Sequence, residues 1–105
     1  MSTDAAASGS PSLATPFELD TAWQIHGLVS IRPERFGALL YHFGTRRLSF
    51  LKSPTLLAVL RSLGEYPTAR EACEHAGVPD VELAQYRAAL ATLAASQMIS
   101  ERTAP

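Results

Sequence analysis

The segment from Leu28 to Pro54, LVSIRPERFGALLYHFGTRRLSFLKSP, decides the fold of this 105-residue chain. Apolar residues alternate along two runs, Ala38–Phe43 and Arg47–Leu51, and Gly44-Thr45 lies between them. A glycine that opens a two-residue loop is typical of a type II′ turn, whose twist matches that of the flanking antiparallel strands. The segment therefore predicts a β-hairpin.

The predicted pairing sorts the side chains of this hairpin into two faces, because residues that lie opposite each other share a face. With Gly44 and Thr45 as the loop, Tyr41 lies opposite Leu48. We expect the core to be covered by the face that holds Leu39, Tyr41, Phe43, Leu48 and Phe50. The second face is too apolar for a purely solvated surface and is expected to dock a partner; it holds Leu40, His42, Arg47, Ser49 and Leu51.

The chain before the hairpin predicts one further strand and an apolar lead-in. The strand runs near Val29–Arg32 and ends at Pro33, because proline is confined to strand ends and edges. The anchors of the lead-in are Phe17, Leu19, Trp23, Ile25 and Leu28. Residues 1–16 are mainly Ser, Ala, Thr, Gly and Pro, which bury too little apolar area to offset the entropy of ordering, so we expect a disordered tail.

After Pro54 the apolar period changes from two residues to between three and four, which predicts helices. Ser53 is a suitable N-cap for the first helix, and Gly64 is expected to end it in a left-handed conformation. Thr68 and Glu71 have the spacing of a capping box for the second helix, which Gly77 closes.

The third helix is predicted to begin at an Asp80 cap and to end at Ser96. Its apolar face holds Leu83, Tyr86, Leu90 and Leu93. Met98 and Ile99 are expected to fold back as a final apolar latch. The order of strand, hairpin and three helices predicts an α+β domain of winged helix-turn-helix type, which spans residues 17–100 and leaves residues 101–105 as a flexible tail.

The residue inventory argues against an enzyme. His26, His42 and His75 belong to three different predicted elements with no carboxylate or cysteine at ligand spacing, so we expect no metal site. The single Cys73 lies on a buried stripe, where cysteine is usually an apolar filler, and we expect no catalytic residue and no cofactor. Because the chain has no signal peptide and no apolar run of membrane-spanning length, we expect a soluble cytoplasmic protein that does not bind membranes.

The net charge is −1, but the charges are divided along the chain. Only Glu34 opposes the cations of the sheet region, which are Arg32, Arg35, Arg46, Arg47 and Lys52. Only Arg70 opposes the anions of the middle helices, which are Glu65, Glu71, Glu74, Asp80 and Glu82. This asymmetry favours an acidic partner at the sheet, although simple solvation of exposed charges is the alternative.

A winged helix-turn-helix also suggests DNA binding, with Gly77 in the turn between two helices. A recognition helix that begins Asp80-Val81-Glu82 would place two carboxylates against phosphate oxygens. The chain also has no basic excess to release counterions. Binding of nucleic acid is therefore the weaker alternative.

Three segments carry a resemblance to a known family. They are Ser30–Glu34 (SIRPE), Phe36–Pro54 (FGALLYHFGTRRLSFLKSP) and Gly77-Val78-Pro79. Together they resemble the chaperones of mycofactocin biosynthesis, which belong to the peptide recognition elements of ribosomally made, modified peptides. These chaperones are relatives of the small chaperone of pyrroloquinoline quinone synthesis. The resemblance extends from about Phe17 to Ile99.

The resemblance implies a domain of three antiparallel strands and three helices that binds a precursor peptide instead of DNA. The leader of the peptide would add as a strand along the edge formed by Arg46, Arg47, Leu48, Ser49, Phe50, Leu51 and Lys52. Its side chains would enter a groove whose wall is Leu83, Tyr86, Arg87 and Leu90. The family further implies delivery of the peptide to a radical S-adenosylmethionine enzyme, which holds the iron–sulfur clusters itself.

Overall fold

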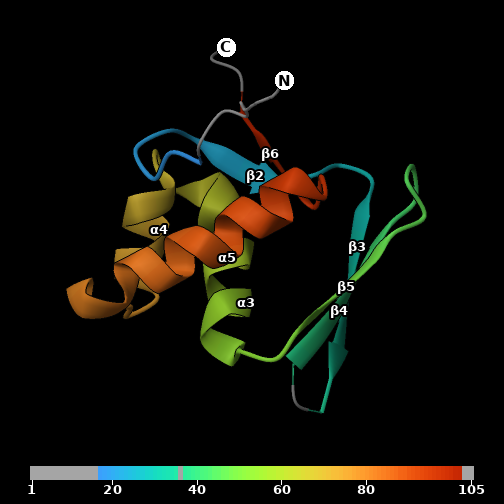
Figure 1. Ribbon diagram of the computed structural model, residues 1–105, viewed down its shortest axis with the longest axis horizontal. Helices are drawn as coiled ribbons and strands as arrows, with labels where there is room; N and C mark the ends of the chain where they lie inside the picture. Colours follow the sequence, from blue (N-terminus) through green and yellow to red (C-terminus); the bar gives the residue numbers. More distant parts are fainter. Residues whose placement is uncertain (1–16, 36, 103–105) are drawn as a thin grey trace, which may run out of the picture.

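The computed structural model describes residues 17–35 and 37–102, and it forms one layer of helices packed against a three-stranded sheet (Figure 1). A second, two-stranded sheet joins the two ends of the described chain. The fold is α+β, as predicted. The elements in chain order are β2 (Trp23–Ile25), β3 (Val29–Glu34), β4 (Gly37–His42), β5 (Leu48–Leu51), α3 (Pro54–Ser62), η1 (Leu63–Glu65), α4 (Ala69–His75), η2 (Asp80–Glu82), α5 (Leu83–Ala95) and β6 (Ile99–Glu101).

The larger sheet has the order β3-β4-β5, and all its pairs are antiparallel. Tyr41 lies opposite Leu48, so the predicted hairpin register is confirmed. The preceding strand does not end at Pro33, which pairs with Ala38 while β3 continues to Glu34. The sheet tolerates this proline because β3 is an edge strand.

The loop of the hairpin differs from the prediction. It contains four residues, because the amide of Arg46 donates to the carbonyl of His42 (2.7 Å) and the amide of His42 donates to the carbonyl of Arg47 (3.0 Å). Arg46 has a left-handed conformation, with φ of 66°, whereas Gly44 does not. The prediction of a two-residue type II′ turn was therefore wrong. The register survives because the loop gains one residue from each strand.

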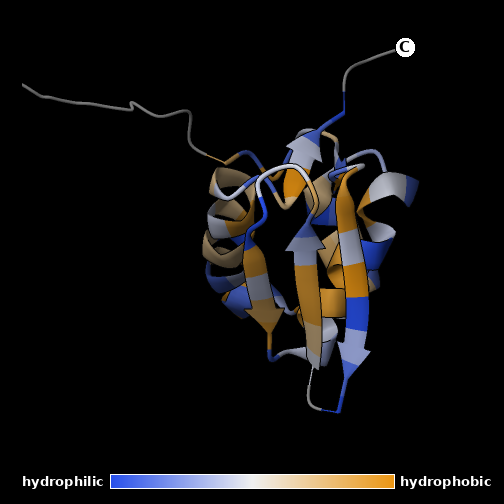
Figure 2. Cartoon of the chain, turned by 90° about the vertical axis from the view of Figure 1, so that its right-hand side faces the viewer, coloured by the Kyte–Doolittle hydropathy of each residue, from blue (hydrophilic) through white to orange (hydrophobic). Residues whose placement is uncertain are grey.

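The predicted assignment of the two sheet faces was also wrong. Leu40 and Leu51 are 1% and 4% exposed and belong to the core, whereas Leu48 is 61% exposed. The reason lies in β3, where Ile31 pairs with Leu40 and packs against the core, while Arg32 points to the other side. The outer face that this leaves open is seen in Figure 2, where apolar segments lie on all three strands.

Three of the local signals predicted to bound the helices, at Ser53, Thr68 and Gly77, are confirmed. The Ser53 hydroxyl oxygen accepts a hydrogen bond from the Leu56 amide (3.1 Å), and the Thr68 hydroxyl oxygen accepts one from the Glu71 amide (3.2 Å). Gly77 ends α4 with φ of 91°. These residues satisfy backbone groups that a helix end would otherwise leave unpaired.

Two helix boundaries differ from the prediction. Gly64 does not adopt a left-handed conformation, because the chain continues from α3 into η1. Asp80 does not cap the third helix through its side chain; it begins η2 after Pro79, and α5 follows at Leu83. The predicted apolar face of α5 is confirmed, since its leucines are buried and Tyr86 packs partly buried against the core.

The end of the described chain forms the predicted latch. Met98 and Ile99 are buried, and Ile99 pairs with Ile25, so that β6 and β2 make the two-stranded sheet. The ordered chain extends beyond Ser100: the Arg102 amide donates to the Ala22 carbonyl (2.9 Å). The Arg102 guanidinium also donates to the carbonyls of Gly64 and Tyr66. The tail predicted at residues 1–16 lies outside the described residues, and so do residues 103–105 of the tail predicted at 101–105.

Candidate peptide-binding site

Within the described residues, β5 is the last strand of the larger sheet and pairs with β4 alone, so its other edge is open at Leu48. The bond from the His42 amide to the Arg47 carbonyl sets the alternation of the ladder. By this alternation Ser49 bonds to Leu40, while the amide and carbonyl of Leu48 point away from β4. Among the described residues, no backbone group of a loop or helix bonds to the main chain of Leu48. The edge is thus a template for one more strand.

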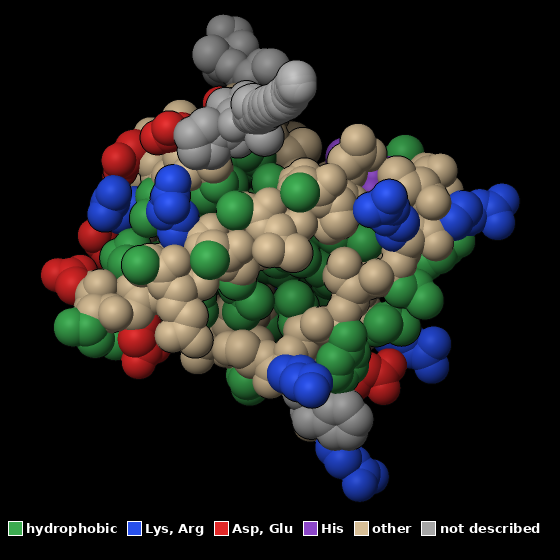
Figure 3. Space-filling model, in the orientation of Figure 1, with side chains coloured by type: hydrophobic (Ala, Val, Ile, Leu, Met, Phe, Trp, Pro, Cys, Tyr) green, Lys and Arg blue, Asp and Glu red, His purple; other side chains and the backbone are tan. Residues whose placement is uncertain are grey.

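A small pocket lies where the chain leaves β5 and enters α3. Its volume is about 110 Å³, and it is lined by Ser53, Leu56, Gln85, Tyr86 and Ala89. Figure 3 shows that this face of the molecule is hollowed below α5, with apolar side chains at the floor. A groove between the third strand of the sheet and the third helix was predicted. The pocket lies instead between the start of α3 and α5, and its lining includes no residue of β5.

The structure separates the predicted site residues into three groups. Arg46, Arg47, Leu48 and Lys52 are exposed along the edge, and Tyr86 and Arg87 are accessible on α5. Phe50 is 41% exposed on the outer sheet face, and Ser49 is half-buried on the inner face. The side chains of Leu51, Leu83 and Leu90 are buried in the core and do not form the wall of a groove.

Four residues that line the pocket were not predicted as site residues: Ser53, Leu56, Gln85 and Ala89. The sequence carries a signal for two of them, because Gln85 and Ala89 are four residues apart and so lie on one face of α5. The sequence predicted Ser53 only as a helix cap. The place of Ser53 and Leu56 in the pocket depends on how α3 packs against α5.

The charges of the described residues remain divided in space (Figure 3). On the sheet side, Arg32 pairs with Glu34 (3.3 Å), while Arg35, Arg46, Arg47 and Lys52 are exposed. The exposed carboxylates of α4 and η2 lie on the helical side, and they are Glu71, Glu74, Asp80 and Glu82. The open edge therefore has a positive local charge.

The buried side chain of His42 stabilises the loop of the hairpin. Its side chain is only 2% exposed, and its Nδ1 atom accepts hydrogen bonds from the amides of Gly44 (2.9 Å) and Thr45 (3.0 Å). His26 lies against it with 4.4 Å between ring centroids, and its own Nδ1 accepts from the Leu28 amide (3.0 Å). The sequence predicted these two histidines on different elements and gave no sign that they meet.

The described residues contain no group of three His, Cys, Asp or Glu side chains that could hold a metal ion. The two histidines that do meet already use Nδ1 as an acceptor for backbone amides. Cys73 is fully buried, and burial raises the pKa of its thiol. A buried, protonated thiol is a poor nucleophile.

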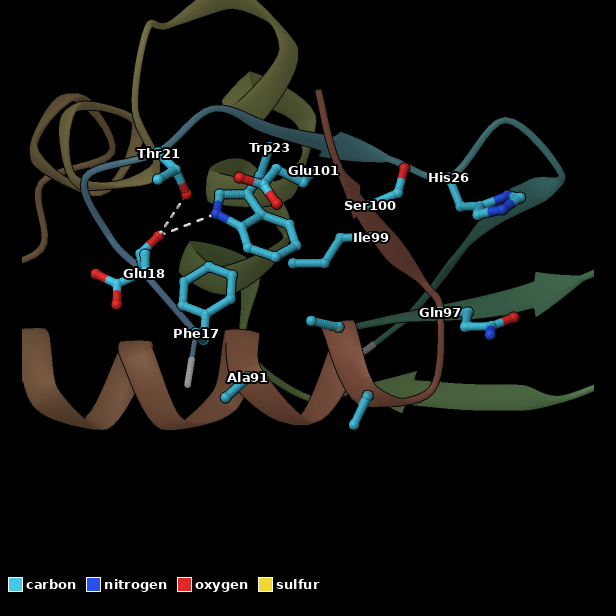
Figure 4. A pocket seen from close by; sticks show the side chains of 12 residues that line it. Phe17, Glu18, Thr21, Trp23, His26, Ala91, Gln97, Ile99, Ser100 and Glu101 are labelled. Carbon is cyan, nitrogen blue, oxygen red and sulfur yellow. Dashed lines mark hydrogen bonds between the residues drawn. The ribbon is translucent and has the colours of Figure 1, made fainter. Parts of the chain in front are cut away.

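A second, larger groove lies on the other half of α5. It has a volume of about 800 Å³, and its floor includes Phe17, Trp23 and Ile99 (Figure 4). The Trp23 ring packs on Phe17 with 4.5 Å between centroids, and its indole nitrogen donates to the Glu18 carbonyl (2.9 Å). Neither lysine nor arginine lines this groove. The sequence did not indicate it, because it depends on the pairing of β2 with β6.

No helix in the described part of the chain is long and apolar enough to cross a membrane.

Comparison with known proteins places the chain in a family. Residues 22–100 match the model of the peptide chaperone MftB family. The peptide chaperone MftB of Mycobacterium ulcerans is 57% identical over 86 residues, which are 82% of this chain and 79% of the relative. The protein of the same name from Mycobacterium tuberculosis is 52% identical over 85% of this chain and 82% of its own length.

The peptide chaperone MftB of Mycolicibacterium smegmatis is also 52% identical, over 79% of this chain and 81% of its own length. The comparison with solved structures gave no significant match. The chain therefore belongs to the peptide chaperone MftB family, whose members act in mycofactocin biosynthesis without catalysing a reaction themselves.

Proposed function

We propose that this protein captures the leader of the mycofactocin precursor peptide as an added strand along β5 and presents it to a radical S-adenosylmethionine enzyme. The observation that carries the proposal is the open edge of β5, which the chain leaves just before the pocket between the start of α3 and α5. An added strand would pair with the outward amide and carbonyl of Leu48, while alternate side chains could enter the pocket. The proposed recognition domain comprises residues 17–100.

The proposed peptide contacts are the accessible part of the predicted set. They are Arg46, Arg47, Leu48, Ser49, Phe50 and Lys52 on the edge, together with Tyr86 and Arg87 on α5. Leu56 and Ala89 would add the floor and wall of the pocket. Leu83 and Leu90 would support this wall from the core.

The exposed cations along the edge favour an acidic leader. Because Arg46, Arg47 and Lys52 are exposed, each would contribute less than about 1 kcal/mol to affinity. Their main effect would be on the association rate, which rises when the potentials of two partners are complementary. A free cysteine agrees with a reducing compartment, and we place the protein in the cytoplasm.

The test of strand addition compares two variants of one edge residue. Leu48→Pro removes the outward amide, whereas Leu48→Thr shortens the same side chain and keeps the amide. We expect the proline variant to bind the precursor peptide at least about tenfold more weakly than the threonine variant in a calorimetric titration, since a lost hydrogen bond costs about 1 kcal/mol and proline also disturbs the approaching strand.

Equal affinity of the two folded variants would refute strand addition at β5. Ser49→Pro provides the opposite control, because its amide belongs to the ladder with β4 and its loss should destabilise the sheet itself. An electrophoretic shift of duplex DNA by the parent protein, without binding of the peptide, would favour the alternative of a DNA-binding protein.

A further inference from the structure

The outer face of the larger sheet carries an exposed apolar patch that the proposed peptide site does not use in full. We call it the outer sheet patch, and it consists of Leu28, Leu39, Tyr41, Phe43, Leu48 and Phe50. Leu28 is 50% exposed and Phe43 is 60% exposed. The rings of Tyr41 and Phe43 pack edge to face, with 4.9 Å between centroids, so the patch has an ordered aromatic centre. Exposed apolar patches of this kind mark interaction surfaces.

A peptide bound along β5 would leave this patch open. Strand addition extends a sheet in its own plane and does not cover either face. The patch also extends away from the β5 edge, across β4 and as far as Leu28, whose carbonyl accepts a hydrogen bond from the Phe43 amide (2.9 Å). It is therefore a second surface, and it shares Leu48 and its strand with the proposed peptide site.

The charges around the patch define its partner. Arg46 and Lys52 are exposed at the two ends of β5, and Arg32, which pairs with Glu34 (3.3 Å), lies on the same face opposite Leu39. A second copy of this face would bring like charges together, which is destabilising. A partner surface that complements the outer sheet patch has apolar side chains at its centre and carboxylates around them.

We propose that the outer sheet patch docks the enzyme that modifies the captured peptide, through an apolar surface of that enzyme framed by carboxylates. This inference rests on the proposed function, which supplies the partner. The side chain of Leu48 lies in the patch while its main chain lies on the open edge, so an enzyme on the patch would lie beside the bound peptide. Docking on the patch thus brings enzyme and peptide together without competition for one surface.

The test uses a double variant, Leu28→Ser with Phe43→Ser, neither of which belongs to the proposed peptide site. The matched control is Val81→Ser, because Val81 is 90% exposed and lies on η2, outside both sheets. The purified chaperone is titrated separately with the precursor peptide and with the purified radical S-adenosylmethionine enzyme. We expect the double variant to bind the peptide like the parent and the enzyme at least tenfold more weakly, and the control to match the parent in both.

Peptide modification at a limiting chaperone concentration should fall in parallel with enzyme binding. Parental affinity for the enzyme in the folded double variant would overturn the inference. If the double variant unfolds, the single variant Phe43→Lys takes its place under the same two expectations. A parent protein that binds the enzyme but not the peptide would instead refute the proposed function.

Two other occupants of the patch would also overturn the inference. One is a second copy of the chain, seen as a concentration-dependent dimer in the parent that is lost in the double variant. The other is a lipid surface, seen as binding to vesicles of phosphatidylserine and phosphatidylcholine that the same double variant loses, while binding to the enzyme is unaffected.

Discussion

Gly37 opens β4 at a point where the backbones of two strands come unusually close. Its φ is +156°, and a Cβ atom added there would collide with the carbonyl oxygen of Leu51. We expect Gly37→Ala to lower the free energy of unfolding by about 2 kcal/mol or more, because the clash is with backbone that cannot move aside. Gly64→Ala is the control, since a Cβ atom at Gly64 meets nothing within 4 Å.

Urea unfolding of both glycine variants measures the difference. The control should stay within about 0.5 kcal/mol of the parent, as surface substitutions usually do. A Gly37→Ala variant as stable as the control would show that β4 and β5 are not in such close contact.

At the scale of elements, the lead-in before β2 is held to the start of α4. The Ala69 and Arg70 amides donate to the carbonyls of Thr21 (3.1 Å) and Leu19 (2.8 Å). The Arg70 side chain pairs with Asp20 (2.7 Å), and this hydrogen bond lowers the pKa of the Asp20 carboxyl below 3.8. These contacts fix the segment that forms one wall of the larger groove.

Because folding lowers the pKa of Asp20, its pair with Arg70 stabilises the folded state above pH 3.8. That contribution is lost as the pH falls through the lowered pKa. We therefore expect Asp20→Asn to be less stable than the parent at neutral pH. This gap in stability between the two proteins should close in acid. Thermal unfolding as a function of pH measures the gap, and Glu18→Gln is the control on the same exposed segment. A gap that stays constant down to the most acidic pH would contradict this role of the pair.

At the scale of the whole molecule, the small pocket and the larger groove lie on different halves of α5. The single tryptophan of the chain lies in the larger groove. We expect the precursor peptide to leave the fluorescence of Trp23 unchanged, because the proposed site is at β5. A variant with Trp23→Phe and Tyr86→Trp moves the reporter to the pocket beside β5, and its emission should shift on binding. A shift of the Trp23 emission alone would place the peptide in the larger groove.

Much of this fold could be predicted from the sequence alone, because it depends on interactions between residues that are close together in the chain. Alternation of apolar residues predicted the hairpin, and a loop centred on Gly44-Thr45 predicted the pairing of Tyr41 with Leu48, which the longer loop keeps because it has the same centre. Ser53, Thr68 and Gly77 predicted helix boundaries, because each acts on backbone groups within a few residues of itself. The family was visible in the same way, since its motifs are short segments, most of them between Ser30 and Pro54.

The tertiary structure decided what depends on contacts between distant segments. Both faces of the hairpin are apolar, so alternation could not tell which one is buried; the pairing of Ile31 with Leu40 decides it, and the alternation of β3 was the available signal. The meeting of His26 with His42 and the pocket between α3 and α5 also depend on contacts between distant segments. Period and capping act along the chain, whereas the burial of a face depends on which elements pack against it.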